Sequence, residues 1–162
     1  MSDDDHSDQP DEAQGTCRVF HSNEDAYQAV IMEKINPGDV IIIRYEGPRG
    51  APGMREMMMT TDALVGRGKA KDVFVVTDGR FSGFTEGSSI GHVAPEAALG
   101  GPIAIVEEGD PILIDIASRL LHLDISEEKF RPGASGKMGN GGGRNITSPT
   151  VLNGHYDTEY FT

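Results

Sequence analysis

Cysteine is nearly absent from this sequence, and there is no long apolar run. A single cysteine, Cys17, among 162 residues rules out a disulfide within the chain. It also excludes an iron–sulfur cluster held by several cysteines of these residues. No apolar run approaches the roughly 20 residues that a membrane-spanning helix needs, so we expect no membrane segment.

Basic residues are also scarce. The chain has 14 Lys and Arg against 26 Asp and Glu, which gives a formal net charge of −12. An acidic chain repels phosphate backbones, so the composition predicts that the protein does not bind nucleic acid. The amino terminus shows neither the basic region nor the apolar core of a secretory signal, and we therefore expect a cytoplasmic protein.

The length predicts one domain with a sizeable core, and the composition changes at both ends. Residues 1–15 carry six acids and no Lys or Arg, which is typical of a disordered acidic tail. Residues 132–162 begin with a glycine-rich stretch and are predicted to be a flexible tail. The folded domain is therefore expected between residues 16 and 131.

Apolar runs bounded by turn residues predict alternating strands and helices. The predicted strands are residues 18–20, 40–45, 73–76, 103–106, 112–116 and 121–125. The predicted helices are residues 24–35, 57–64 and 95–99, with a short last helix after Ser126. Ser22 is expected to cap the first helix. The turn at residues 108–110 is expected to join strands 103–106 and 112–116 as a hairpin. Ile112, Ile114 and Ile116 alternate with Leu113 and Asp115, so one face of that strand is expected to be buried more deeply.

Three polar loops follow or adjoin these strands: the first loop is residues 46–57, the second is residues 77–83 and the third is residues 91–102. The second loop, residues 77–83 (TDGRFSG), directly follows a hydrophobic strand, where a rigid scaffold commonly presents catalytic groups. Gly79 and Gly83 are expected to allow crowded backbone there, with Ser82 between them. An ordinary Asp-Gly turn that happens to contain a serine remains an alternative.

The first loop, residues 46–57, contains GPRGAPGMREM, and the third loop, residues 91–102, opens the segment GHVAPEAALGGPIAIVEEGD. Together with TDGRFSG, these motifs resemble the carboxy-terminal domain of the dihydroxy-acid dehydratase family, which includes phosphogluconate dehydratases. The resemblance runs from about residue 17 to residue 130, and the GHVAPEA motif is more similar to the branched-chain branch. It implies an α/β fold, a β-barrel-like swivelling β/β/α domain flanked by helices.

The same resemblance implies a hydro-lyase that dehydrates 2,3-dihydroxy acids to 2-keto acids. Ser82 matches the family's catalytic base, and Glu56 matches a magnesium ligand. A serine that caps its own turn and a glutamate that interacts with a helix dipole are the alternative interpretations of these two residues. Because one carboxylate holds magnesium poorly, we expect neither Mg²⁺ nor an iron–sulfur cluster to be held by this chain alone. In a complete enzyme, both would be bound with an amino-terminal domain.

Arg49, Arg55 and Arg80 are candidates for binding the carboxylate of the substrate by paired hydrogen bonds. The alternative interpretation is that these arginines are solvated surface charges or contacts with another domain. Asp78 is expected to shape its loop, and His92 is expected to be structural rather than a catalytic acid or base.

The expected partners are a dihydroxy acid and an amino-terminal dehydratase domain or subunit. The methionines at residues 54–58 are predicted to fill the core, although an exposed patch there would allow copies of the chain to associate. Two other hypotheses stay open besides a dehydratase part: a stand-alone binding module without catalysis, and an inactive remnant of a longer gene.

Overall fold

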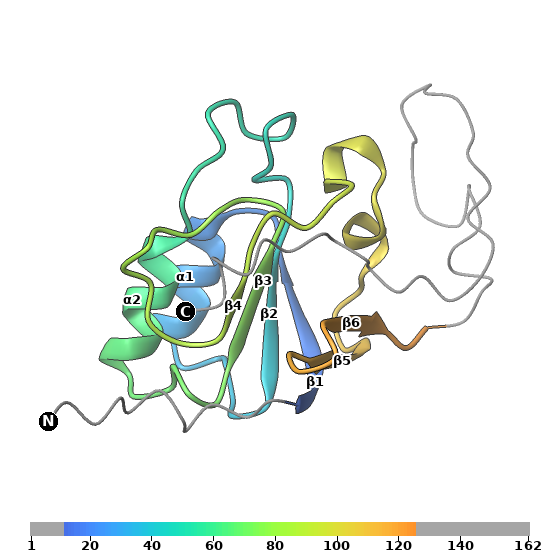
Figure 1. Ribbon diagram of the computed structural model, residues 1–162. Coiled ribbons are helices and arrows are strands. Elements are labelled where there is room, and N and C mark those ends of the chain that lie inside the picture. Colours follow the sequence, from blue (N-terminus) through green and yellow to red (C-terminus); the bar gives the residue numbers. More distant parts are fainter. Residues whose placement is uncertain (1–11, 126–162) are drawn as a thin grey trace, which may run out of the picture.

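The computed structural model describes residues 12–125, which form a curled six-stranded sheet, or half-barrel, with two helices on one face (Figure 1). The strands lie in the order β4-β3-β2-β1-β5-β6. Strands β1 to β4 are parallel, whereas β5 and β6 are antiparallel to their neighbours. The strands are β1 Glu12–Phe20, β2 Asp39–Ile43, β3 Phe74–Thr77, β4 Ser89–Ile90, β5 Pro111–Asp115 and β6 Leu120–Leu123. This arrangement confirms the predicted α/β fold of the β/β/α kind.

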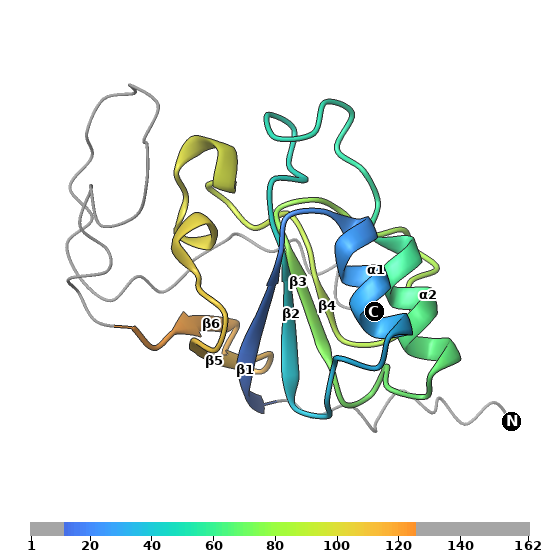
Figure 2. The same ribbon diagram turned by 180° about the vertical axis from the view of Figure 1, so that it is seen from behind.

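The two α-helices, α1 (Asn23–Ile31) and α2 (Met58–Gly66), lie side by side on the parallel part of the sheet, away from the β5–β6 hairpin (Figure 2). Helix α1 begins where predicted, because the Ser22 side chain accepts a hydrogen bond from the Asp25 backbone N–H at 3.1 Å. It ends at Ile31 rather than at residue 35. Glu33 adopts a left-handed φ of 59°, which does not continue a helix.

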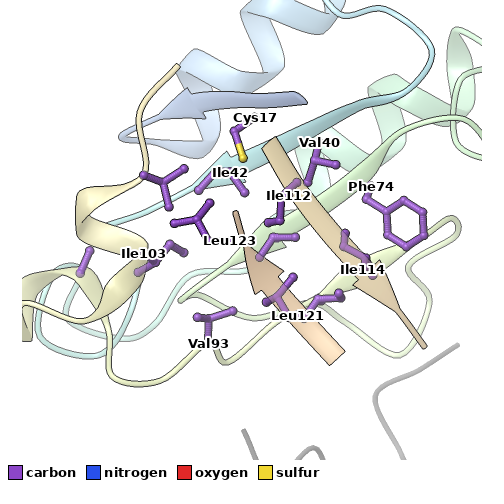
Figure 3. Close-up of a cluster of buried hydrophobic side chains, with 14 residues drawn as sticks. Cys17, Val40, Ile42, Phe74, Val93, Ile103, Ile112, Ile114, Leu121 and Leu123 are labelled. Atoms are coloured by element: carbon purple, nitrogen blue, oxygen red, sulfur yellow. The ribbon is translucent and has the colours of Figure 1, made fainter. Parts of the chain in front are cut away.

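Strand β2 serves both halves of the hydrophobic core, because its five residues are all buried and their side chains alternate between the faces of the sheet. Ile41 and Ile43 pack beneath the two helices. Val40 and Ile42 point to the opposite face and pack inside the curl of the sheet against the β5–β6 hairpin and residues of the third loop (Figure 3). The near-continuous apolar run of β2 follows from this two-sided burial.

The predicted strand at residues 103–106 is wrong, because this segment is the 3₁₀ helix η2 (Pro102–Ile105). Pro102 starts it and has no backbone N–H to give to a sheet. The backbone carbonyls of Ile103 and Val106 instead accept hydrogen bonds from the Arg44 guanidinium, at 3.2 and 2.9 Å. The apolar run reflects burial, since both of these residues are less than 5% exposed.

The hairpin is formed instead by β5 and β6, and Ile112 and Ile114 lie on its buried face as predicted. Preceding this hairpin, residues 97–99, predicted as part of a short helix at residues 95–99, form the 3₁₀ helix η1 (Ala97–Leu99). No helix among residues 12–125 is both long enough and apolar enough to cross a membrane.

Strand β1 begins earlier than predicted. Residues 12–15, assigned from composition to the acidic tail, pair with β5, and Glu12 lies opposite Asp115. The strand pairing overrides the polar composition because β1 is held between β2 and β5. The rest of the predicted acidic tail, the predicted helix after Ser126 and the predicted flexible tail lie outside the described residues.

Candidate functional site

The first and second loops meet at one edge of the sheet. They follow β2 and β3, which are parallel neighbours, so both loops leave the sheet at the carboxyl ends of the strands (Figure 1). A short parallel bridge joins Glu56 to Arg80. In this bridge the Met57 N–H donates to the Arg80 carbonyl at 2.9 Å, and the Arg80 N–H donates to the Arg55 carbonyl at 3.3 Å. The structure therefore brings together two loops that carry the candidate residues Glu56 and Ser82.

Glu56 is half-exposed at the end of the first loop. Its Oε1 lies 3.9 Å from the Arg80 Nε, and the two side chains are 40% and 47% exposed. An ion pair of this length between exposed groups is weak. The carboxylate can therefore exchange this contact for a cation, for which oxygen ligands are suited. Its role as a metal ligand stays a prediction.

Ser82 lies in a tight turn of the second loop, two residues beyond the bridge, and is partly buried. Its Oγ accepts a hydrogen bond from the Phe84 N–H at 3.3 Å, and its carbonyl accepts one from the Thr85 N–H at 3.1 Å. This is the geometry of a serine that caps its own turn. The same N–H donor also favours negative charge on the oxygen, so the geometry is compatible with either role of Ser82.

The three candidate arginines each contact a different acidic residue rather than forming one cluster. The Arg55 guanidinium forms an ion pair with Glu24 of α1, and this hydrogen bond lowers the pKa of the Glu24 carboxyl. That pairing favours the surface-charge interpretation of Arg55. Arg80 lies against Glu56, as described. Arg49 is exposed, and its backbone N–H donates to the Glu96 carboxylate.

Asp78 occupies the centre of the loop region and is 1% exposed. Its Oδ1 accepts a hydrogen bond from the Glu46 N–H at 3.0 Å. Its Oδ2 accepts hydrogen bonds from the Tyr45 N–H at 3.1 Å and from the Ala97 N–H at 2.8 Å. One carboxylate thus holds backbone from the first and third loops, in agreement with the expectation that Asp78 shapes the loop.

Two further buried carboxylates were missed by the sequence analysis. Glu96, 5% exposed, accepts hydrogen bonds from the N–H groups of Arg49 and Gly50 at 2.9 and 3.3 Å. Glu46, 3% exposed, accepts one from the Asn23 N–H at the start of α1 at 3.0 Å. The sequence feature that could have pointed to these two carboxylates is an acidic residue next to Gly or Pro in a loop. Such residues are usually exposed to solvent, so the sequence alone does not identify them as buried. Their backbone hydrogen-bond partners are seen only in the folded structure.

The glycines of the second loop differ from each other. A β-carbon on Gly79 would lie 3.1 Å from the Glu46 Cβ, 3.1 Å from the Met57 Cε and 3.2 Å from the Arg55 carbonyl oxygen, so the backbone is crowded as predicted. A β-carbon on Gly83 would meet nothing within 4 Å, and the expected crowding there is wrong. The His92 N–H donates to the Gly79 carbonyl at 2.8 Å, which gives its backbone a structural role.

The described residues do not by themselves fit a magnesium ion or a cluster. Among residues 12–125, no group of three or more His, Cys, Asp or Glu side chains is arranged to hold a metal ion. Glu56 offers a single exposed carboxylate. Cys17 is fully buried in the core, facing Ile42 and Ile112, so its thiol is not presented to a cluster (Figure 3).

The methionines at the start of α2 divide between core and surface. Met57 is fully buried, as predicted for a residue that fills the core. Met58 and Met59 are 52% and 42% exposed, so the prediction that Met58 packs in the core is wrong. With Val65, which is 40% exposed, they give α2 an apolar outer face.

Comparison with known proteins gives consistent matches. The sequence profile described as "Dihydroxy-acid/6-phosphogluconate dehydratase C-terminal" matches residues 5–146. The chain is 59% identical over 116 residues to a protein named dihydroxy-acid dehydratase from Synechococcus sp. (strain JA-3-3Ab), covering 72% of this chain and 20% of that protein. It is 60% identical over 116 residues to the protein of that name from Thermosynechococcus vestitus, covering 72% and 21%.

A third relative of the same name, from Syntrophobacter fumaroxidans, is 56% identical over 124 residues, covering 75% of this chain and 22% of the relative. The chain therefore spans about a fifth of the length of the curated relatives that it matches. The family match over residues 5–146 contains all three loops.

Proposed function

Since the chain belongs to the dihydroxy-acid/6-phosphogluconate dehydratase carboxy-terminal family, we propose that it is the carboxy-terminal part of a hydro-lyase. The proposed reaction converts a 2,3-dihydroxy acid to a 2-keto acid in branched-chain amino-acid biosynthesis. Relatives about 55–60% identical, all named dihydroxy-acid dehydratase, support this choice over a sugar acid. The structural observation that carries the proposal is the bridge between Glu56 and Arg80, which joins the two candidate site loops.

The proposed base is Ser82. Its oxygen takes the proton from C2 of the substrate, and the C2–H electron pair forms a C2–C3 double bond as the C3–O bond breaks. The departing hydroxide takes the proton that Ser82 removed and leaves as water, which returns the Ser82 oxygen to its deprotonated form, and the resulting enol tautomerises to the 2-keto acid. A free serine is too weak a base at neutral pH, so its oxygen needs positive charge nearby. The Phe84 N–H contributes a donor to that oxygen.

The proposed cation ligand is Glu56. A bound Mg²⁺ would act as a Lewis acid on the oxygens of the substrate, and an iron–sulfur cluster is the second metal group that we propose for the complete enzyme. Residues 12–125 do not supply the remaining ligands, so these must come from elsewhere in that enzyme. We also place the enzyme in the cytoplasm, where reducing conditions preserve cysteine thiolates that bind a cluster.

The proposed partner of this domain is the amino-terminal portion of the dehydratase, on the same polypeptide or on a second subunit. Its length in the relatives, about four-fifths of each protein, is sufficient to carry the metal groups. The alternatives, a non-catalytic binding module and an inactive remnant, predict a domain that cannot replace the corresponding part of an active relative.

A chimera tests the proposal. The 116-residue part of the Thermosynechococcus vestitus relative that matches this chain is replaced by the corresponding residues of this chain, and formation of a 2-keto acid from 2,3-dihydroxy-3-methylbutanoate is measured after iron and Mg²⁺ are supplied. We expect turnover by the chimera and none by the 162-residue chain alone. Within the chimera, Ser82→Ala should lower kcat by about 10²–10⁴-fold, which is the typical contribution of a general base.

The matched control is Ser118→Ala, an exposed serine in the turn between β5 and β6. It should leave kcat unchanged. An inactive chimera with a normal circular-dichroism spectrum would favour the non-catalytic alternatives, and a fully active Ser82→Ala chimera would exclude Ser82 as the base.

A further inference from the structure

Both ends of the first loop are fastened to the same short stretch of the second loop. At the start of the first loop, the N–H groups of Tyr45 and Glu46 donate to the Asp78 carboxylate. At its end, Arg55 and Met57 exchange backbone hydrogen bonds with Arg80. Asp78 and Arg80 are two residues apart, so only Gly79 separates the two attachments.

The space around Gly79, between the hydrogen bonds that hold the two ends of the first loop, is filled. A β-carbon there would press on Glu46 from one end of the first loop and on Arg55 and Met57 from the other, all at 3.1–3.2 Å. The third loop is attached to the same point, because the Ala97 N–H donates to Asp78 Oδ2 and the His92 N–H donates to the Gly79 carbonyl. Displacement of Asp78 therefore moves all three loops.

We propose that Asp78 is a positioning residue that sets the place of Glu56 relative to Ser82. Its link to catalysis rests on the function proposed above. The carboxylate is required chemically, because three N–H donors converge on its two acceptor oxygens. Asparagine has nearly the same shape but only one acceptor oxygen, so its NH₂ group would face at least one backbone N–H without an acceptor. A buried donor left in this way is costly and is relieved by movement of the loop.

Asp39 provides a matched control. It is also a buried aspartate of the same sheet, 9% exposed, at the opposite end of β2. Its Oδ2 accepts hydrogen bonds from the Asn36 N–H at 2.8 Å and from the Arg18 guanidinium at 3.2 Å. Asp39→Asn therefore removes a comparable buried carboxylate without touching the three loops.

The first test is amide hydrogen exchange on the full chain. In Asp78→Asn, we expect exchange about tenfold or more faster at Met57 and Arg80, whose N–H groups do not bond to Asp78, with unchanged protection in β2 and α1. Asp39→Asn should leave Met57 and Arg80 unchanged. Unchanged exchange at Met57 and Arg80 in Asp78→Asn would overturn the proposal. General unfolding of Asp78→Asn beside a folded Asp39→Asn would overturn it too, because Asp78 would then be a residue of overall stability.

The second test is kinetic and uses the chimera described above. Misplacement of the loops should lower kcat about 100-fold in Asp78→Asn with little change in KM, whereas Asp39→Asn should retain kcat. Loosened loops with an unchanged kcat would overturn the positioning role while leaving the proposed function intact. An unsubstituted chimera without turnover would reject the proposed function and with it the catalytic link, and the exchange data would still decide whether Asp78 fixes the loops.

Discussion

Glu56 and Arg80 face each other across a short parallel bridge, with the Arg80 Nε 3.9 Å from the Glu56 Oε1. The contact connects loops that are separated by a helix and a strand in the sequence. It places the candidate cation ligand next to the stretch that carries the candidate base, Ser82.

Glu56→Gln should remove the proposed cation ligand and leave the fold intact. An amide oxygen is a weaker ligand than a carboxylate for Mg²⁺, so kcat of the chimera should fall at least about 100-fold. Because the ion pair with Arg80 is exposed, stability should change by less than about 1 kcal/mol. Steady-state kinetics and thermal melting measure the two effects. Glu24→Gln, at another exposed glutamate paired with an arginine, is the control and should retain kcat.

Gly50→Ala should destabilise the domain, whereas Gly83→Ala should not. A β-carbon on Gly50 would lie 2.6 Å from the Tyr45 carbonyl oxygen and 2.9 Å from its Cα, so backbone must shift. The expected cost is about 1–3 kcal/mol, as for other overpacked sites. Gly83 has open space and no positive φ, so its substitution should stay within about 0.5 kcal/mol. Urea unfolding compares the two, and equal losses would contradict the structure.

The Glu24 carboxyl should titrate below its ordinary pKa of 4.5, chiefly because Arg55 donates a hydrogen bond to it. Since the folded pKa is lowered, the contribution of this pair to stability is present above the ordinary pKa and is lost as pH falls through the lowered value. Arg55→Gln should move the pKa of Glu24 back toward 4.5. Carbon-detected NMR titration of the Glu24 side chain measures it, and an unchanged pKa in the variant would show that Arg55 is not the cause.

Arg44→Lys should release the η2 segment. The Arg44 Nη1 donates to the carbonyls of Ile103, Ala104 and Val106 at 3.2, 2.6 and 2.9 Å, and the Arg44 Nη2 lies 2.9 Å from the His21 Nε2. A lysine side chain is one bond shorter and ends in a single nitrogen, so it cannot keep both sets of contacts. We expect a loss of about 1–3 kcal/mol in unfolding free energy. The control Arg67→Lys, at an exposed arginine paired with Glu33, should cost less than about 1 kcal/mol. Equal effects of the two substitutions would argue against a special role of Arg44.

Local sequence signals predicted the elements whose formation depends on neighbours along the chain. The Ser22 cap, the apolar runs of β2 and β3, and the alternation of Ile112 and Ile114 each express a preference of a few adjacent residues, and each is found in the structure. The first and second loops each follow a hydrophobic strand in the sequence, but only the structure shows that these strands are parallel neighbours and that the loops share one edge of the sheet. The motif resemblance gave the family and the fold.

Only the tertiary structure decided features whose causes lie far apart in sequence. Residues 103–106 are apolar enough for a strand. The Arg44 guanidinium, about 60 residues earlier, instead donates hydrogen bonds to carbonyls of this segment, which forms a 3₁₀ helix. Residues 12–15 look like an acidic tail, but β5 supplies their hydrogen-bond partners. The three backbone amides that converge on Asp78 come from 33 and 32 residues before it and from 19 residues after it in the sequence. A buried carboxylate is stable only with such donors, and no local pattern contains them.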